Sequence, residues 1–167
     1  MKKVLIAYFS LSGNTEKMAQ YVAEGVRMSG QQAAVKKVSA IKSAADLAGY
    51  DGYIFGCPTY YRDMTEPMKQ FLFLAKKAAL AGKPAGAFGS YTHDGAAAGM
   101  VFDTMQHVFQ MEPFELGPLS VKDIMLEETG RGQERRTYVA GEVHGNPGEG
   151  MRACQDYGRT FGEKLGA

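Results

Sequence analysis

The amino-acid sequence predicts one α/β domain, built from a parallel β-sheet with helices on both faces. Short apolar runs alternate along the chain with segments whose apolar residues recur at helical spacing. Strands that alternate with helices form a parallel sheet, because each crossover returns the chain to the same end of the sheet. The chain has 167 residues, enough to bury one core, so we expect one domain over residues 1–167 with one site.

Five apolar runs are the predicted strands. They are Val4–Phe9, Ala33–Val38, Tyr53–Phe55, Ala85–Gly89 and Phe114–Val121. The first run follows two lysines, as a secretion signal would, but polar Ser10, Ser12 and Asn14 come directly after it. A run this short fits a buried strand rather than a signal or a membrane span.

Three segments carry clear helical patterns. Their apolar positions are Met18, Ala19, Val22, Ala23 and Val26 in the first, Met68, Phe71, Leu72 and Ala75 in the next, and Met151, Cys154, Tyr157, Phe161 and Leu165 in the last. We expect the first helix to end near Gly30, and we expect Thr65 to cap a helix that has Pro67 in its first turn. The pattern around Ala44–Leu47 predicts only a weak additional helix.

The segment at about residues 122–146 predicts a β-hairpin inserted between the fifth strand and the last helix. Its arms are the short apolar stretches Ile124–Leu126 and Tyr138–Ala140, and they flank a polar tip. We interpret this hairpin as a solvated excursion, in preference to a partner-docking or dimer-forming element.

Composition and charge narrow the function classes. Hydrophobic residues make up 45% and charged residues 22% of the chain, as in an average globular domain. Lys and Arg total 19 against 18 Asp and Glu, without a long basic run, so we expect neither a nucleic-acid partner nor a membrane. Cys57 and Cys154 lie far apart, and His93, His107 and His144 lie in unrelated segments. This spacing predicts free thiols, no metal site and a cytoplasmic location.

The loop after the first predicted strand has the composition of a phosphate site. Open parallel sheets bind ligands at the carboxyl ends of their strands, and the loop Ser10-Leu11-Ser12-Gly13-Asn14-Thr15 leads from such an end into a helix. Hydroxyls, a glycine and the free amides of the helix end suit a phosphate dianion. The loop has no Lys or Arg, and the nucleotide-triphosphate and Gly-x-Gly-x-x-Gly patterns are absent. A single terminal phosphate therefore fits better than a pyrophosphate.

The segment Ser-x-Ser-Gly-Asn-Thr-Glu-Lys-Met-Ala resembles the FMN-phosphate loop of flavodoxins and related domains. The resemblance implies a flavodoxin-like three-layer sandwich, with a five-stranded parallel sheet in the order 2-1-3-4-5 and helices on both faces. It also implies one non-covalently bound FMN, whose phosphate would be held by Ser10, Leu11, Ser12, Gly13, Asn14 and Thr15.

Two further loops extend the resemblance. The segment from Gly56 to Met64 resembles the flavin loop of WrbA-type quinone reductases and of the flavodoxin modules in flavo-diiron proteins, and the segment from Gly89 to Gly95 resembles a flavodoxin loop beside the flavin. The resemblance implies that the flavin ring is lined by Pro58, Thr59, Tyr60, Tyr61, Arg62, Ser90, Tyr91, Thr92, His93, Asp94 and Gly95. An exposed loop histidine is an equal alternative for His93.

Two other readings of these loops fit less well. Some phosphatases of this fold class use Cys-x5-Arg after the first strand, whereas Cys57 and Arg62 form Cys-x4-Arg after the third predicted strand. We therefore interpret Cys57 as structural. A phosphate-receiver domain would need acidic residues where Ser10 and Cys57 stand.

The resemblance implies two alternative functions. The first is an electron-transfer flavoprotein that serves a redox partner protein, with no catalytic side chain. The alternative is an FMN-dependent NAD(P)H:quinone oxidoreductase with an open flavin face. Classical flavodoxins are strongly acidic and carry a glycine beside the flavin, whereas this chain has a net charge of +1 and no glycine from Thr59 to Met64. These departures favour the enzyme, whereas the third loop favours the carrier. A homo-oligomer, common among such reductases, is left open.

Overall fold

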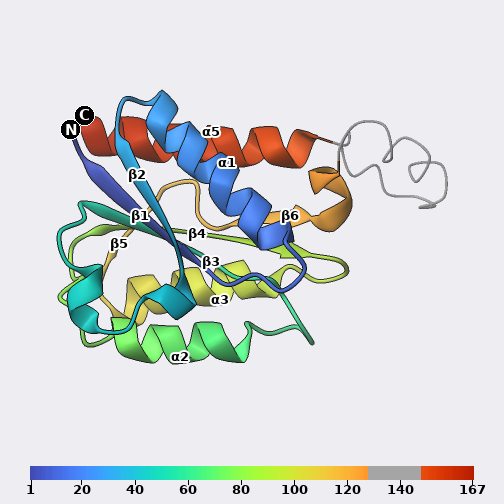
Figure 1. Cartoon of the computed structure of the whole chain (residues 1–167), viewed down its shortest axis with the longest axis horizontal. Helices are drawn as coiled ribbons and strands as arrows, with labels where there is room; N and C mark the ends of the chain where they lie inside the picture. The colour runs from blue at the N-terminus through green and yellow to red at the C-terminus, as the bar shows by residue number, and fades with distance from the viewer. Residues whose placement is uncertain (128–147) are drawn as a thin grey trace.

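The computed structural model describes residues 1–127 and 148–167, and there the chain folds into three layers (Figure 1). The central sheet contains β1 (Lys3–Tyr8), β2 (Gln32–Lys37), β3 (Gly52–Gly56), β4 (Pro84–Tyr91), β5 (Glu112–Pro113) and β6 (Leu119–Lys122). Helices α1 (Asn14–Met28) and α5 (Glu149–Gly166) cover one face, and α2 (Glu66–Ala75) and α3 (Ala96–Asp103) cover the other. The α/β architecture predicted from the alternation is confirmed.

The strand order is β2-β1-β3-β4-β5 with all pairs parallel, which confirms the expected order 2-1-3-4-5. In the interior strand β1, Ile6 pairs with Val35 of β2 on one side and with Ile54 of β3 on the other. Residues 4–8 are all buried, because helices cover both faces of this strand. The winding reverses between β1 and β3, and open α/β sheets bind ligands beside such a reversal.

The predicted strand Phe114–Val121 is wrong in its first half: residues 114–118 belong to no strand, and only residues 119–121 lie in β6. The short β5 comes just before the predicted run, and β5 and β6 pair with the start and the end of β4 along the same edge. Between them, Gly117 has a φ of 69° and Pro118 has no amide hydrogen, which interrupts strand pairing. The Tyr157 hydroxyl of α5 fills the break, since it donates to Gly117 O at 2.7 Å and accepts from Ala87 N of β4 at 3.1 Å. A side chain therefore replaces the missing strand hydrogen bond.

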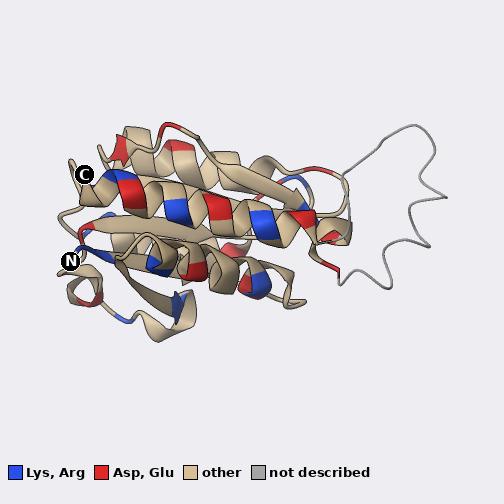
Figure 2. Cartoon of the chain, turned by 90° about the horizontal axis from the view of Figure 1, so that it is seen from above, with Lys and Arg blue, Asp and Glu red and all other residues tan. Residues whose placement is uncertain are grey.

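Helices α1 and α5 lie close together, and glycines allow the approach. A Cβ on Gly158 would lie 2.0 Å from Val22 O, and a Cβ on Gly25 would lie 2.0 Å from Gln155 O. No side chain fits at such distances in a close-packed interior. The packing fixes α1, and with it the loop that leads into α1, against the sheet. On the outer side of this layer, basic and acidic residues alternate (Figure 2).

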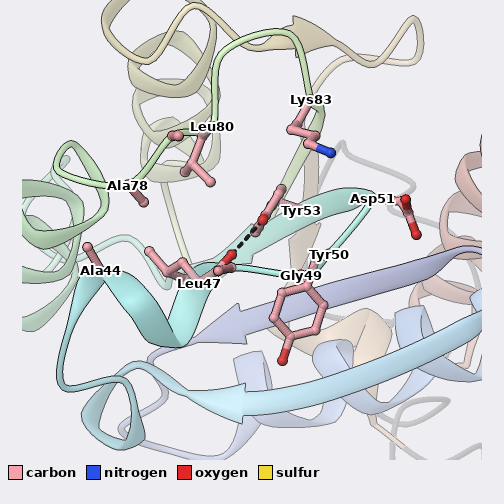
Figure 3. A pocket seen from close by; sticks show the side chains of 11 residues that line it. Ala44, Leu47, Gly49, Tyr50, Asp51, Tyr53, Ala78, Leu80 and Lys83 are labelled. Atoms are coloured by element: carbon pink, nitrogen blue, oxygen red, sulfur yellow. Dashed lines mark hydrogen bonds between the residues drawn. The ribbon is translucent and has the colours of Figure 1, made fainter.

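The crossover from β2 to β3 contains no α-helix. Two 3-10 turns, Val38–Ala40 and Ala44–Leu47, stand where the sequence indicates a weak helix. The Asp46 carboxylate closes the second turn by accepting from the amides of Lys42 and Ser43 at 2.8 and 3.1 Å. Figure 3 shows a hollow that this short crossover leaves at the amino end of β3, where the Tyr53 hydroxyl donates to Leu47 O at 2.5 Å.

Two local expectations are corrected. Thr65 lies at the N-cap position of α2, but its side chain forms no capping bond and its Oγ1 instead lies 3.5 Å from Cys57 Sγ. Ile124–Leu126, expected as a strand, belongs to a 3-10 turn, Asp123–Leu126, which contacts with α1 and the third loop hold in place. The other expected arm, Tyr138–Ala140, lies outside the described residues. No helix in the described part of the chain is long and apolar enough to cross a membrane.

Candidate functional site

Three loops meet at the carboxyl end of the sheet, after β1, β3 and β4. Direct contacts join them: the Thr15 and Ser90 hydroxyls lie 2.9 Å apart, and Thr59 N donates to Ser90 O at 3.1 Å. The Thr59 hydroxyl also accepts from Ala97 N at 3.1 Å, which caps the start of α3 from the neighbouring loop. The candidate residues of the first, second and third loops are therefore assembled into one site.

The first loop presents backbone donors at the start of α1. Lys17 N donates the first intrahelical bond of α1, to Gly13 O at 3.0 Å, so the amides of residues 14–16 have no acceptor within the helix. Gly13 occupies the N-cap position with a φ of 95°, and no side chain caps the helix. The Ser10 hydroxyl accepts from Gly13 N at 3.1 Å, which closes the turn. These donors, together with the helix dipole, favour an anion.

The side chains of the first loop differ in their access to a ligand. Leu11 and Ser12 are exposed, and Asn14 is half-buried. Thr15 is only 1% exposed, and its hydroxyl faces Ser90. In this arrangement Thr15 offers its amide to a ligand, whereas Ser12 offers its hydroxyl.

Lys17, the first basic residue after this loop, bonds to a partner outside the loop. The Lys17 ammonium donates to Leu126 O at 2.7 Å and so ties α1 to the turn after β6. Tyr8, at the end of β1, donates to the Glu16 carboxylate at 3.1 Å. Burial, followed by this bond, raises the pKa of Tyr8 to about 12, so its hydroxyl stays protonated near neutral pH. The first loop thus offers only neutral donors, as its composition indicates.

The second loop ends in a strained hairpin turn. Tyr60 and Asp63 exchange two backbone hydrogen bonds of 3.0 Å, and the residues between them, Tyr61 and Arg62, have φ angles of 50° and 60°. Left-handed backbone costs a non-glycine residue about 1–2 kcal/mol. The turn holds the Tyr61 side chain fully exposed to solvent. Strain of this kind concentrates at ligand clamps, which makes the turn a candidate contact for a ring.

Tyr60 of the second loop lies beside Ser12 of the first. Burial raises the pKa of Tyr60, and the neighbouring Ser12 hydroxyl offsets part of the rise. The Arg62 guanidinium lies 3.7 Å from the Asp94 carboxylate, which connects the second loop to the third. The second loop therefore contacts both of the other loops.

Cys57 and Pro58 are buried beneath the second loop. The Cys57 thiol donates to Pro58 O at 3.2 Å and accepts from Thr65 N at 3.4 Å. Burial raises the pKa of this thiol, whereas a nucleophilic cysteine needs a lowered one. The geometry agrees with a structural Cys57.

The third loop brings together an aromatic ring, a histidine and a carboxylate. Tyr91 is half-buried beside Gly95, where an added Cβ would lie 3.0 Å from the tyrosine ring. Thr92 and His93 are exposed. Asp94 accepts from the first amide of α3, Ala96 N, at 2.9 Å, so it supports the helix start as well as pairing with Arg62.

Sequence reasoning missed Asp123. Its carboxylate accepts from the Thr92 hydroxyl at 2.7 Å and thereby anchors the third loop to the turn after β6. The partners are 31 residues apart, and no local pattern marks such a contact. Within the part of the chain that the structure describes, no group of His, Cys, Asp and Glu side chains is arranged to hold a metal ion.

Comparison with known proteins agrees with this geometry. The flavodoxin domain model matches residues 5–144. An NAD(P)H dehydrogenase (quinone) from Gluconacetobacter diazotrophicus is 33% identical, over 99% of this chain and 94% of its own. A flavodoxin from the domain Archaea has a TM-score of 0.78 at 22% identity, with 99% of both chains covered. Oxidised flavodoxin 1 from Bacillus cereus has a TM-score of 0.70 at 25% identity, covering 95% of this chain and 96% of that one. The chain belongs to the flavodoxin domain family.

Proposed function

We propose that this chain binds one FMN across the three loops and transfers electrons to and from a redox partner. Family membership implies a flavin, and the first loop fits the phosphate of FMN. The observation that carries the proposal is the uncapped start of α1, whose amides at residues 14–16 lie beside an exposed Ser12 hydroxyl. A terminal phosphate dianion would be held there by neutral donors and by the helix dipole.

The second and third loops would hold the ring. Tyr61 is an exposed aromatic side chain on a strained turn, and Tyr91 is half-buried on the facing loop. Contact with the face of a flat aromatic ring would remove both side chains from water and offset the strain of the turn. The backbone of residues 58–60 and 90–95 would position the polar edge of the ring, because hydrogen bonds between these loops fix them relative to each other.

Bound FMN supplies reversible one- and two-electron chemistry, and the protein sets the potentials by its relative affinity for the redox states. In this site Arg62 places a positive charge at the loop tip, and Asp94 balances it at 3.7 Å. We infer that the near-neutral pair avoids the strong repulsion that an acidic surface imposes on an anionic reduced flavin. The side chains here bind and orient the cofactor, and we assign none of them to proton transfer.

Substitution of Ser12 tests the phosphate assignment. Ser12→Ala removes a hydrogen bond to a charged group, and we expect FMN to dissociate about ten- to a hundredfold more readily. The control is Ser39→Ala, which alters an exposed serine outside the three loops. Flavin fluorescence titration of the apoprotein measures both dissociation constants. Equal constants for Ser12→Ala and the unaltered protein would contradict the assignment.

A second candidate function is FMN-dependent NAD(P)H:quinone oxidoreduction. The observation that favours it is the 33% identity, over almost the whole chain, to an NAD(P)H dehydrogenase (quinone). Anaerobic mixing with NADPH, and then with NADH, separates the two candidates by the flavin absorbance. Rapid bleaching that a quinone reverses would establish the enzyme. Reduction by dithionite but by neither nucleotide would establish the carrier, whose reductant is then a protein.

We propose a cytoplasmic location for either activity, because both cysteines are unpaired, as is usual for thiols in a reducing compartment.

A further inference from the structure

A hollow that shares only Ser10 with the three-loop site lies at the carboxyl ends of β1 and β2. It has a volume of about 430 Å³ and is bounded by the end of β1, the turn after β2 and one side of α2. The 3-10 turns of the second crossover leave it open, because they cover less of the sheet than a helix would. Pockets of about 300–1,000 Å³ accommodate small organic molecules.

The walls of this hollow are apolar and its rim is cationic. Phe9, Ile41, Phe71 and Leu74 form an apolar lining, in which Ile41 and Phe71 are 4% exposed. Lys37 and Lys42 stand at the rim, together with the hydroxyls of Ser10 and Ser39. No Asp or Glu lines the hollow, and within the described residues neither lysine forms an ion pair.

Two other hollows lack this combination of an apolar lining with lysines that form no ion pair. The hollow at the amino end of β3 is smaller, about 320 Å³, and both Asp51 and Lys83 line it (Figure 3). The hollow of about 250 Å³ beside β5 contains Lys164, whose ammonium lies 3.7 Å from the Glu115 carboxylate. Of these three hollows, the one at the β1 and β2 ends is lined by lysines and by no carboxylate.

The hollow is also distinct from the proposed phosphate loop. The first loop runs to α1, whereas α2 bounds the hollow, and these helices cover opposite faces of the sheet (Figure 1). Only Ser10 belongs to both, and its hydroxyl already accepts from Gly13 N on the loop side.

We propose that this hollow binds an aromatic phosphate monoester of the size of a nucleoside monophosphate, in addition to any flavin. The aromatic body would lie against the apolar lining around Phe9 and Phe71, and the phosphate would lie between the ammonium groups of Lys37 and Lys42. The volume accommodates one such molecule, and two unpaired lysines match the two charges of its phosphate. The proposal does not depend on flavin binding.

Calorimetric titration with AMP tests the proposal, on protein that has been incubated with FMN and then freed of unbound FMN by gel filtration, so that AMP cannot report on a flavin site and free FMN cannot compete for the hollow. We expect one AMP per chain, binding that weakens with added salt, and weaker binding of uncharged adenosine. The variant Lys37→Gln/Lys42→Gln should raise the AMP dissociation constant about tenfold, since each exposed ion pair changes a binding constant by a factor of about 1.5–5. Its FMN affinity should stay the same.

The matched control is Lys76→Gln/Lys77→Gln, which removes the same charge from exposed positions at the end of α2 that do not line the hollow. It should bind AMP as the unaltered protein does. The proposal is overturned if AMP does not saturate the protein, if both double variants weaken AMP equally, or if AMP releases bound FMN and so raises flavin fluorescence. A chain that binds AMP in this way but never binds FMN would support this proposal while contradicting the proposed function.

Discussion

The contact between the Thr15 and Ser90 hydroxyls joins the first loop to β4 beneath the candidate site, and a double-mutant cycle measures its interaction energy. Both side chains are buried, at 1% and 3% exposure, and their hydroxyls lie 2.9 Å apart. Thr15→Val keeps the side-chain volume but leaves the Ser90 hydroxyl without this partner, which costs about 1–3 kcal/mol of unfolding free energy. Ser90→Ala should cost a similar amount for the converse reason. The double variant removes both polar groups, so we expect it to cost less than the sum of the single variants.

Urea unfolding of the four apoproteins, followed by far-ultraviolet circular dichroism, measures the cycle. The control is Thr160→Val, which removes a hydroxyl that bonds within α5 to Asp156 O, and we expect a change below about 0.5 kcal/mol. Unchanged m-values, the slopes of unfolding free energy against urea concentration, would show that the substitutions do not alter the compactness of the folded or unfolded state. Strictly additive effects of Thr15→Val and Ser90→Ala would refute the buried contact, and with it the coupling between the first loop and β4.

Other predictions follow from the packing and the buried polar groups. Tyr157→Phe should destabilise the protein by about 1–3 kcal/mol, because the buried Ala87 amide of β4 and the half-buried Gly117 carbonyl lose their partner; a loss below about 0.5 kcal/mol in urea unfolding would contradict this role. Gly158→Ala should destabilise the folded protein by about 1–3 kcal/mol, although alanine has the better helix propensity, because its Cβ would clash with α1. Gly99→Ala has open space around the added Cβ and should stabilise the folded protein by up to about 1 kcal/mol. Thermal unfolding compares the two variants. Neither cysteine should react with Ellman's reagent at pH 8 until the protein unfolds, because burial raises the pKa of both thiols; rapid labelling of the native protein would count against this. Unfolding free energy should fall as the pH rises from about 10 towards 12, because the unfolded chain releases the Tyr8 proton near pH 10 while the folded pKa is about 12; a flat profile in urea titrations at alkaline pH would contradict the shift.

The parts of the fold that the sequence predicts are those with strong local signals. The buried strands are continuous apolar runs, and α1, α2 and α5 carry apolar residues at helical spacing. The phosphate loop is also a local signal, because its hydroxyls and its glycine are adjacent in the chain. Helix α3 lacks such a signal, because the Ala96–Asp103 segment begins with small residues and has no contrast between polar and apolar positions.

The remaining features depend on contacts between distant segments. The break between β5 and β6 is bridged by Tyr157 of α5, and the burial of Thr15 depends on Ser90, 75 residues away. The turn at Tyr61 and Arg62 adopts a backbone that glycine and asparagine usually occupy, so propensity gives no signal for it. Sequence patterns therefore located the loops of the site, whereas the contacts that assemble them had to be seen in the structure.

The flavin content of the purified protein tests the central claim most directly. The protein is passed through gel filtration after incubation with excess FMN, and the flavin released by heat is identified and counted against the chain concentration. We predict one FMN per chain, with substantially less retained by Ser12→Ala. A folded protein that emerges without flavin would contradict the account.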